Sequence, residues 1–491
     1  MLGEENYGGL VGVRARVVSA WDPWTVAWPV GAIAAAAAVG AMVGRGQVKP
    51  AILPVAVLVV MLFARVPVAG YVAVLWSVGT AIDMLWLPQV GISSWRFAPS
   101  ELLLWIALGS LVFMPRETRQ ELKVFAVRRE SVVMAIFLAA VLGGVAVGVE
   151  NGATLHAATF DVRLMLFYAA FWPALAALAS GRKLVFGLVS AGVVAVVFLQ
   201  IGQVIVGPST RLFLIAPSDL ASSLTPGDTG FLRVRPPGLT TVYIVAAFAL
   251  ARVLWGQPRR RMLGWGMVVV TLTGVILSLN RNMLLGLSVG LCVAALVAPQ
   301  RHRFVVTAAT VALAVFGFGL LAQSSSALKS NAVVSRITSI TNYSGLKTQT
   351  LNDRYYENHI AWRRIRDHPI GGLGWGPDYG AMLLSSDDGF LVSTPRSFMH
   401  EQYLWIWMRA GLLGLLALVG SLALGLWNGA RWLRARHGKD DAWLGAGVVV
   451  ALVAMAASSN VAIYLTPPDS TVPLVAVLAL AAVLRRNLAR S

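Results

Sequence analysis

The sequence predicts an all-α fold: a polytopic helical membrane protein with about 12–14 transmembrane helices and one long extracytoplasmic loop. Hydrophobic residues make up 57% of the 491 residues and charged residues only 13%, whereas a typical soluble protein has about 25% charged residues. Apolar runs long enough to cross a bilayer as helices also recur along almost the whole chain. Lipid offers the backbone no hydrogen-bond partners, and these runs are too long for barrel strands, so helices are expected.

The expected spans follow the apolar runs in order. The 50–64 run is short and barely separated from its neighbour, so the count falls toward twelve if the early runs merge. The spans are expected near residues 25–43, 50–64, 66–84, 98–115, 131–149, 162–180, 184–207, 239–255, 263–279, 282–298, 304–322, 402–427, 443–461 and 471–485.

The loops between these spans differ in charge, which predicts their sides of the membrane. The net charge of +18 arises largely from short basic loops, so it indicates membrane topology and not nucleic-acid binding. The basic segments are expected to be cytoplasmic, and the intervening ones, with the long stretch at 323–401, extracytoplasmic. The basic segments are 115–130, 181–183, 257–262, 299–303, 428–439 and the C-terminal tail.

Three regions are expected along the chain. Residues 1–322 hold the N-terminal transmembrane helices with an outward loop at 208–238, and residues 402–491 hold the C-terminal helices. Residues 323–401 form a polar stretch far longer than an ordinary connection, and stretches of that length are usually functional. Within it, the sequence predicts an amphipathic helix over 352–368 and a glycine-rich turn over 369–380.

The expected outer face keeps several arginines and a histidine that stands immediately before an apolar run. Arginine presents a planar fork suited to phosphate oxygens, and Arg281 sits in a minimal turn where it would meet a lipid headgroup or a diphosphate. His400 is either an anchor at the membrane surface or a group that moves a proton. Few ionisable groups lie within the spans, and Asp83, Glu101 and Arg163 fall near span ends, which weakens a proton-coupled transporter.

No sequence motif for a metal site is present: there is no His-Glu-x-x-His helix, no cysteine pair and no Asp-x-Asp pair. We therefore expect neither a metal nor another cofactor.

Several motifs follow one another in the second half of the chain: Arg354, Trp362, a His-Pro-Ile-Gly-Gly-Leu-Gly turn at 368–374, His400 and a Gly-Leu-Leu-Gly element at 411–414. This order resembles the O-antigen ligase and O-antigen polymerase superfamily. Members show an arginine followed by a tryptophan-containing helix, then a His-Pro-hydrophobic-Gly-x-Gly turn, and later a histidine opening a span with Gly-Leu-hydrophobic-Gly. These elements correspond in order to the motifs named above; the stretch "SLNRNMLLG" around Arg281 and "RVRPPGL" around Arg235 are also similar.

The resemblance implies a metal-independent glycosyltransferase of the bacterial inner membrane, multi-pass, with its active site on the extracytoplasmic face. Such enzymes take a glycan from a polyprenyl-diphosphate carrier, such as undecaprenyl diphosphate, and pass it to a glycan or glycolipid acceptor during lipopolysaccharide or polysaccharide biosynthesis. The resemblance places the essential histidine at His400 and diphosphate-binding arginines at Arg281 and Arg354, with Arg235 as a third candidate. Membrane lipids are the other expected partners.

Two positions depart from the family pattern. The residue after the histidine is often asparagine and is Glu401 here, so Glu401 is a candidate to orient the imidazole or to serve as the base. The acidic residue often found before the Gly-Leu-x-Gly element is replaced by Arg409 and Ala410. Both positions could affect acceptor choice.

Elementary chemistry agrees with the implied reaction. A glycosyl diphosphate has a good leaving group, so an enzyme needs cations at the departing phosphates and a base near the acceptor oxygen. The sequence leaves the subtype open. A ligase uses a different terminal acceptor and is the preferred reading, a polymerase uses a second lipid-linked repeat, and a lipid-glycan flippase or other transporter is the rival class.

Overall fold

The computed structural model covers 491 residues and describes most of those between 48 and 490. The predicted spans at 25–43 and 304–322 lie outside the described residues. The chain divides into two compact units, Met1–Phe63 and Ala64–Ser491. Apart from helix α2, most of which belongs to the first unit, all elements below lie in the second. The described ranges are 48–79, 90–92, 95–126, 128–207, 212–213, 234–257, 261–278, 280–298, 348–380, 382–384, 391–393, 399–460 and 462–490.

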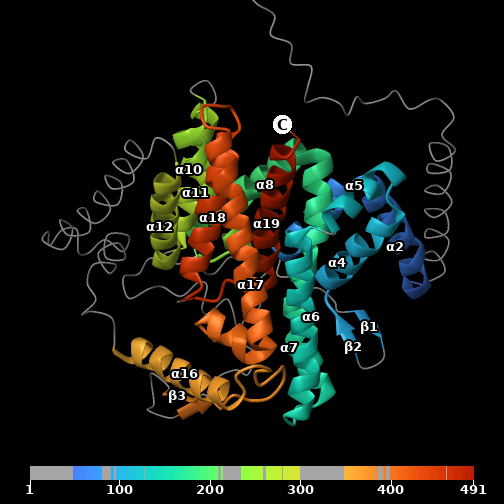
Figure 1. The fold of residues 1–491 in the computed structure, drawn as a ribbon, viewed down its shortest axis with the longest axis vertical. Coiled ribbons are helices and arrows are strands. Elements are labelled where there is room, and N and C mark those ends of the chain that lie inside the picture. Colours follow the sequence, from blue (N-terminus) through green and yellow to red (C-terminus); the bar gives the residue numbers. More distant parts are fainter. Residues whose placement is uncertain are drawn as a thin grey trace, which may run out of the picture. The chain divides into compact units, whose positions relative to one another are not determined.

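The described part of the chain is mainly helical, which confirms the predicted all-α polytopic class (Figure 1). Two antiparallel hairpins are its strands, β1 (Val90–Ile92) with β2 (Trp95–Phe97) and β3 (Met382–Leu384) with β4 (Leu391–Ser393). The helices are α2 (Val48–Arg65), α3 (Pro67–Val78), α4 (Pro99–Ser110), α5 (Arg116–Ala126), α6 (Arg129–Glu150), α7 (Leu155–Val162), α8 (Phe171–Val206), α10 (Leu239–Trp255), α11 (Arg261–Leu277), α12 (Arg281–Val297), α16 (Thr348–Asp367), α17 (Gln402–Ala435), α18 (Ala442–Ser458) and α19 (Pro468–Leu488), with 3₁₀ turns η2 (Leu111–Phe113) and η3 (Arg163–Ala170).

Four helical segments among the described residues are long and apolar enough to cross a membrane, and a fifth is obtained if α2 and α3 count as one broken span. Five further apolar helices have 10–17 residues. The total of 12–14 spans stays a prediction. The four long segments are Arg129–Glu150, Leu155–Val206, Gln402–Ala435 and Pro468–Leu488, and the shorter helices are Pro99–Phe113, Leu239–Trp255, Arg261–Leu277, Asn282–Val297 and Ala442–Ser458.

Two long helices contain a break at a glycine. In α8 the break is at Gly181, where the sequence predicted a basic loop at 181–183; the structure instead keeps one helical element of 36 residues with a kink. In α17 the break is at Gly411, which has φ +71° and ψ 179°. A positive φ of this kind is readily available to glycine and costly for other residues. The first turns of α17, before Gly411, therefore have a different axis direction from the rest of the helix.

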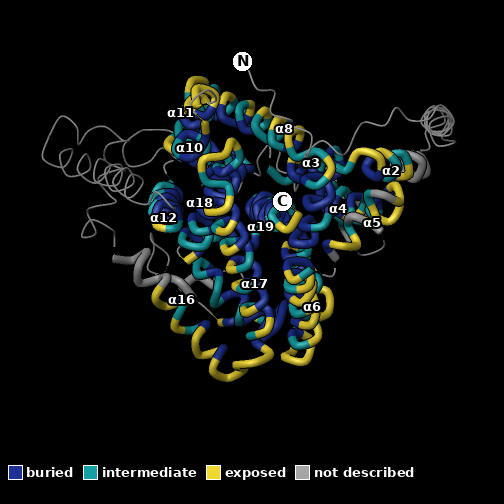
Figure 2. Tube along the Cα trace, turned by 45° about the horizontal axis from the view of Figure 1, so that its top comes forward, coloured by how far each residue is buried: buried dark blue, intermediate teal, exposed yellow. Residues whose placement is uncertain are grey.

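Helix α18 lies at the centre of the C-terminal helices and packs against α10, α12, α17 and α19. Glycines permit the closest approaches: a Cβ added at Gly290 of α12 would lie 2.5 Å from the carbonyl oxygen of Val450, and one at Gly445 would lie 2.5 Å from the oxygen of Gly429. Small residues at such contacts are typical of membrane helix packing. Figure 2 shows α18 and α19 as largely buried, whereas α6 carries many exposed residues.

The expected amphipathic helix of the long polar stretch is confirmed as α16. Its buried face carries Glu357, Ala361 and Ile365, spaced four residues apart, while Tyr355, Trp362 and most of the arginines are exposed. The glycine-rich turn follows at 369–380, where Gly372, Gly374, Gly376 and Gly380 have positive φ angles. In the following we call residues 369–380 the glycine turn.

Candidate functional site

His400 lies immediately before α17, at the N-terminal end of that helix. The next residue, Glu401, is the N-cap, and its Oε2 accepts a hydrogen bond of 2.5 Å from the backbone N–H of Leu404. Burial raises the pKa of the Glu401 carboxyl. Glu401 thus acts as a structural cap for the first turn of α17.

The buried face of α16 supplies a partner for the His400 imidazole. Nδ1 of His400 lies 3.0 Å from Oε2 of Glu357, and the His400 backbone N–H donates to the same oxygen at 3.4 Å. The Glu357 side chain is 1% exposed and that of His400 is 34% exposed. A carboxylate accepts only, so the proton sits on Nδ1 and the more accessible ring presents Nε2 as its basic nitrogen.

Sequence reasoning missed Glu357. The signal that could have found it is its place in the helix pattern, because Glu357 precedes Ala361 and Ile365 at intervals of four and so falls on the apolar stripe. A carboxylate on a buried stripe is costly unless a hydrogen-bonding partner meets it there.

The C-terminal end of α18 joins the start of α17 to the start of α12. The backbone N–H of Gln402 donates to the carbonyl oxygen of Ser459 at 3.2 Å, and the hydroxyl of Ser458 donates to the carbonyl oxygen of Asn282 at 3.1 Å. Arg281 is the first residue of α12. The two predicted site segments are therefore bridged by two consecutive serines.

Arg235 belongs to the same end of the helix bundle. The preceding residue, Val234, donates its N–H to the carbonyl oxygen of Leu277 at 3.3 Å. Tyr464, in the connection between α18 and α19, accepts a hydrogen bond of 2.6 Å from the Asn280 amide. Burial raises the pKa of Tyr464 to about 12, while the bond from Asn280 and the positive charge of Arg235 act to lower it. Arg235 thus lies within electrostatic reach of the turn that precedes Arg281.

The glycine turn is bonded to both sides of the break in α17. The N–H of Leu373 donates to the carbonyl oxygen of Met408 at 2.6 Å, and the N–H of Leu412 donates to the carbonyl oxygen of Ile370 at 2.9 Å. The second bond depends on the backbone turn at Gly411, where an added Cβ would lie 2.5 Å from the oxygen of Ile370. The glycine turn and the Gly-Leu-Leu-Gly element at 411–414 are therefore hydrogen-bonded to each other, and we call this contact region the joint.

Trp375 attaches the glycine turn to α6. Its indole Nε1–H donates to the carbonyl oxygen of Val141 at 2.8 Å, and its backbone N–H donates to that of Gly144 at 2.9 Å. A Cβ at Gly148 would lie 1.9 Å from the Trp375 carbonyl oxygen, so the chain passes close to the helix there. These contacts fix the turn between α6 and α17.

Arg409, one of the departures from the family pattern, is fully buried and belongs to the same joint. Its NH1 donates to the carbonyl oxygens of Gly374 and Pro377, each at 2.8 Å, and its guanidinium lies 4.2 Å from the ring centre of Trp405. These contacts indicate that Arg409 holds the glycine turn against α17, which argues against direct contact with an acceptor.

The two other predicted arginines are described only through their backbones. Arg281 begins α12, and Arg354 lies in α16 three residues before Glu357, which places the two on neighbouring positions of one helix face. The side chains of Arg281 and Arg354 lie outside the described part of the structure. Of the predicted site, the structure therefore brings together the segments that carry Arg235, Arg281 and His400, and the contact between Glu357 and His400 joins the Arg354 segment of α16 to them.

The ionisable groups near the span ends form a structural pair. Arg163 binds Glu101 through both nitrogens of its fork, with Nε 2.7 Å from Oε1. The Arg163 guanidinium also lies within 6 Å of the rings of Phe97 and Phe160. Asp83 lies outside the described residues. The Arg163–Glu101 pair accounts for two of the three groups that a proton-coupled transporter would have used.

The fold and this site define a polytopic membrane protein with a histidine–carboxylate pair at one end of its helix bundle. Residues 266–419 match the protein family described as O-antigen ligase, a region that includes Arg281, Glu357, His400 and the break at Gly411. The match supports placement of the chain in the O-antigen ligase superfamily and confirms the resemblance seen in the sequence motifs. No curated protein matches the chain.

Proposed function

We propose that the protein is a metal-independent glycosyltransferase of the bacterial inner membrane, which moves a glycan from a polyprenyl-diphosphate carrier to an acceptor hydroxyl on the extracytoplasmic face. The observation that carries the proposal is the contact between His400 and the buried Glu357, within the region that matches the O-antigen ligase family. The acceptor is a glycan or glycolipid different from the donor, as in a ligase.

In the proposed step, the acceptor oxygen attacks the anomeric carbon of the donor sugar. The bond from that carbon to the diphosphate oxygen breaks, the polyprenyl diphosphate leaves with the electron pair, and the acceptor proton passes to Nε2 of His400. Glu357 is a positioning residue in this scheme: its carboxylate holds Nδ1–H and stabilises the imidazolium that forms.

Guanidinium groups at Arg281 and Arg354, and at Arg235 as a third, stabilise the charge on the departing diphosphate. Arginine suits this task because its planar fork forms bidentate bonds with phosphate oxygens. The links from α18 to the starts of α12 and α17 support this assignment, because they bring the Arg281 segment beside the His400 segment. In this scheme the leaving group needs no metal ion.

A polymerase would use the same diphosphate site and base with a second lipid-linked repeat as its acceptor. One experiment tests the function and separates these subtypes. Purified protein in detergent is given a labelled lipid-diphosphate oligosaccharide, with and without a separate glycolipid acceptor, and the products are sized. Release of lipid diphosphate with one new product of fixed size supports the ligase. A ladder of lengths from donor alone indicates the polymerase, and transport across liposomes with no new glycosidic bond would favour the flippase.

A further inference from the structure

A cavity of about 550 Å³ lies among α8, α10, α11, α18 and α19, far from the candidate site. It is lined by Trp443 and Leu444 at the start of α18, whereas Ser458 at the other end of that helix contacts the site. With a rise of 1.5 Å per residue, the two ends lie roughly 20 Å apart. The cavity volume is within the range of about 300–1,000 Å³ that is usual for ligand sites.

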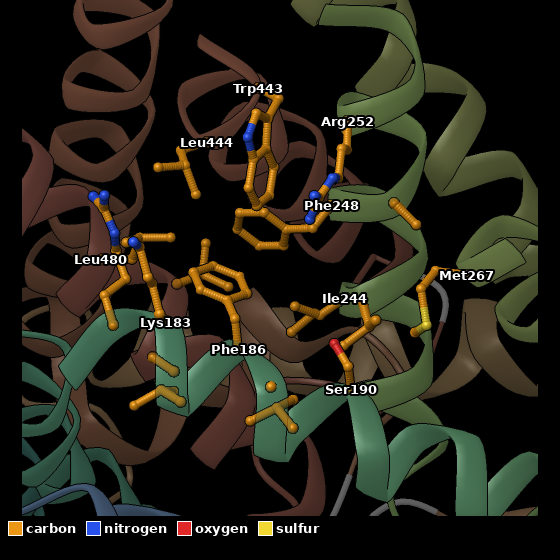
Figure 3. Close-up of a pocket in the computed structure, with 18 of the residues that line it drawn as sticks. Lys183, Phe186, Ser190, Ile244, Phe248, Arg252, Met267, Trp443, Leu444 and Leu480 are labelled. Atoms are coloured by element: carbon orange, nitrogen blue, oxygen red, sulfur yellow. The ribbon is translucent and has the colours of Figure 1, made fainter. Parts of the chain in front are cut away.

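The interior of the cavity is apolar and aromatic. Figure 3 shows Phe186, Phe248 and Trp443 facing one another across it. The ring centres of Phe186 lie 5.6 Å from Phe248 and 5.7 Å from Trp443, and the rings meet edge to face. Ile244, Met267, Leu444 and Leu480 add aliphatic and thioether side chains to the lining shown there. Such walls suit a hydrocarbon chain.

Cations lie around this apolar interior. Arg182 and Lys183 come directly after the break in α8, and both line the cavity. Arg252 lines it from α10, and its guanidinium lies 5.2 Å from the ring centre of Trp443 (Figure 3). The stacking on Trp443 orients the Arg252 guanidinium at the cavity wall. Three basic side chains from two helices therefore converge at one cavity.

Two acidic residues, Asp440 and Asp441, also line the cavity, and the charge of Asp441 acts on Arg182. Asp441 is bound by Arg436 through Nε and NH2, each at 3.1 Å, so its charge is largely offset. Asp440 is exposed. The three cations outnumber these two acids, and the surroundings of the cavity are positive even before Arg436 is counted.

The helices around the cavity also present apolar side chains to their surroundings. Leu184 on α8 is 52% exposed, and Leu263, which lines the cavity from α11, is 64% exposed. In a protein whose helices lie in lipid, exposed leucines of this kind are expected to meet acyl chains. A ligand for this cavity would thus enter from the lipid and carry a negative charge.

We propose that this cavity binds an anionic phospholipid, with an acyl chain between the three aromatic rings and the phosphate held by Arg182, Lys183 and Arg252. Arginine and lysine form charge-assisted hydrogen bonds to phosphate oxygens, and basic pockets between membrane helices are known sites for anionic headgroups. The bound lipid bridges α8, α10 and α18. Because it binds the folded state, it also stabilises the bundle.

The test uses the full-length protein, delipidated in detergent and titrated with phosphatidylglycerol or with phosphatidylcholine of the same acyl chains. Native mass spectrometry counts bound lipids, and thermal unfolding measures stabilisation. We expect phosphatidylglycerol to bind at least about tenfold more tightly than phosphatidylcholine, because the headgroup of the first carries a net negative charge. Equal binding of both lipids would overturn the proposal.

Two variants locate the site. Replacement of two of the three cations, Arg182→Gln with Lys183→Gln, should weaken phosphatidylglycerol binding by about tenfold or more. The matched control is Arg116→Gln with Lys123→Gln, which removes the same charge from exposed positions of α5. Unchanged binding in the first pair, or an equal loss in the control pair, would contradict the assignment.

A third variant tests the acyl-chain part of the cavity. A Cβ at Gly187, which lines the cavity, meets no atom within 4 Å, so Gly187→Phe fills space without a backbone clash. Gly143→Phe on exposed α6 is the control with equally open surroundings. We expect Gly187→Phe to lose most of the bound lipid and Gly143→Phe to keep it. Full displacement of the lipid by inorganic phosphate, or tighter binding of a polyprenyl phosphate, would show that the site recognises a different ligand.

Discussion

Nδ1 of His400 and Oε2 of Glu357 lie 3.0 Å apart, and this contact joins a helix of the long polar stretch to the start of a membrane helix. A carboxylate that is 1% exposed is costly to bury unless hydrogen bonds satisfy it. The same oxygen also accepts from the His400 backbone. The pair therefore fixes both the position and the tautomer of the imidazole.

Substitution of His400 by alanine should reduce turnover by about 10²–10⁴-fold, the usual effect of losing a general base. Donor affinity should change little, whereas stability should decrease by about 1–3 kcal/mol because the buried Glu357 carboxylate loses its side-chain partner. Turnover per folded molecule, with donor binding measured separately, checks this. The control is His359→Ala, an exposed histidine on α16 that stacks on Tyr355. Near-normal turnover in His400→Ala would identify the histidine as a surface anchor.

Glu357 should affect the rate through His400. Glu357→Gln keeps an acceptor for Nδ1–H but loses the charge that stabilises the imidazolium, so kcat should fall while the KM for donor stays nearly unchanged. Glu357→Ala should lower kcat further, since the ring is no longer held. The double variant Glu357→Gln with His400→Ala should be no slower than His400→Ala alone. Additive losses in that double variant would show that Glu357 acts independently of the histidine.

The arginines should behave differently from the histidine. Arg281→Ala and Arg354→Ala each remove charge-assisted bonds to the diphosphate, so both donor affinity and kcat should decrease. Lysine at either position should rescue only partly, because a point charge lacks the bidentate fork. Arg363→Ala, at an exposed position of α16, is the control. Full activity of the lysine variants would argue against bidentate binding, and full activity of the alanine variants would remove these residues from the site.

Many element bounds could be predicted from the sequence because hydrophobic run length determines where a membrane helix starts and stops. The expected span 239–255 coincides with α10, and 282–298 and 443–461 differ from α12 and α18 by a few residues. The break within α17 was not predicted. The break is accompanied by a hydrogen bond between Leu412 and Ile370, which are distant from each other in the sequence. The only local sign of it is the glycine at position 411, which has a positive φ.

The candidate site was predicted in part, through motif resemblance and charge. His400 was found this way, whereas Glu357 was overlooked because its function depends on packing of α16 against the start of α17. Arg409 was considered for acceptor choice, and its burial against the glycine turn gives it a structural role instead. In both cases the missing information was a tertiary contact between segments separated by more than thirty residues.

The joint between the glycine turn and α17 should tolerate no side chain at Gly411. Gly411→Ala places a Cβ 2.5 Å from the Ile370 carbonyl oxygen at a φ of +71°. Strain of this kind costs about 1–3 kcal/mol before the clash is added. We expect lower expression and a lower unfolding temperature. The control is Gly420→Ala in the same helix, where the added atom lies 3.5 Å from the nearest side chain. Equal stability of the two variants would contradict the structural role of this break.

Glu401 should contribute to stability with a characteristic pH dependence and little to the chemistry. Burial raises the pKa of the Glu401 carboxyl. At pH values between the ordinary pKa of a glutamate and this raised pKa, the folded protein keeps a proton on Glu401 that the unfolded chain has lost. The stability of the wild-type protein should therefore decrease as the pH rises through the window between the ordinary and the raised pKa. Glu401→Gln cannot titrate and should lack this decrease, although its poorer cap costs about 0.5–2 kcal/mol at all pH values. Unfolding temperatures measured across this window compare the two proteins, with Glu150→Gln as the control at an exposed carboxyl. If Glu401→Gln instead loses turnover per folded molecule while His400→Ala keeps it, Glu401 is the base of the pair.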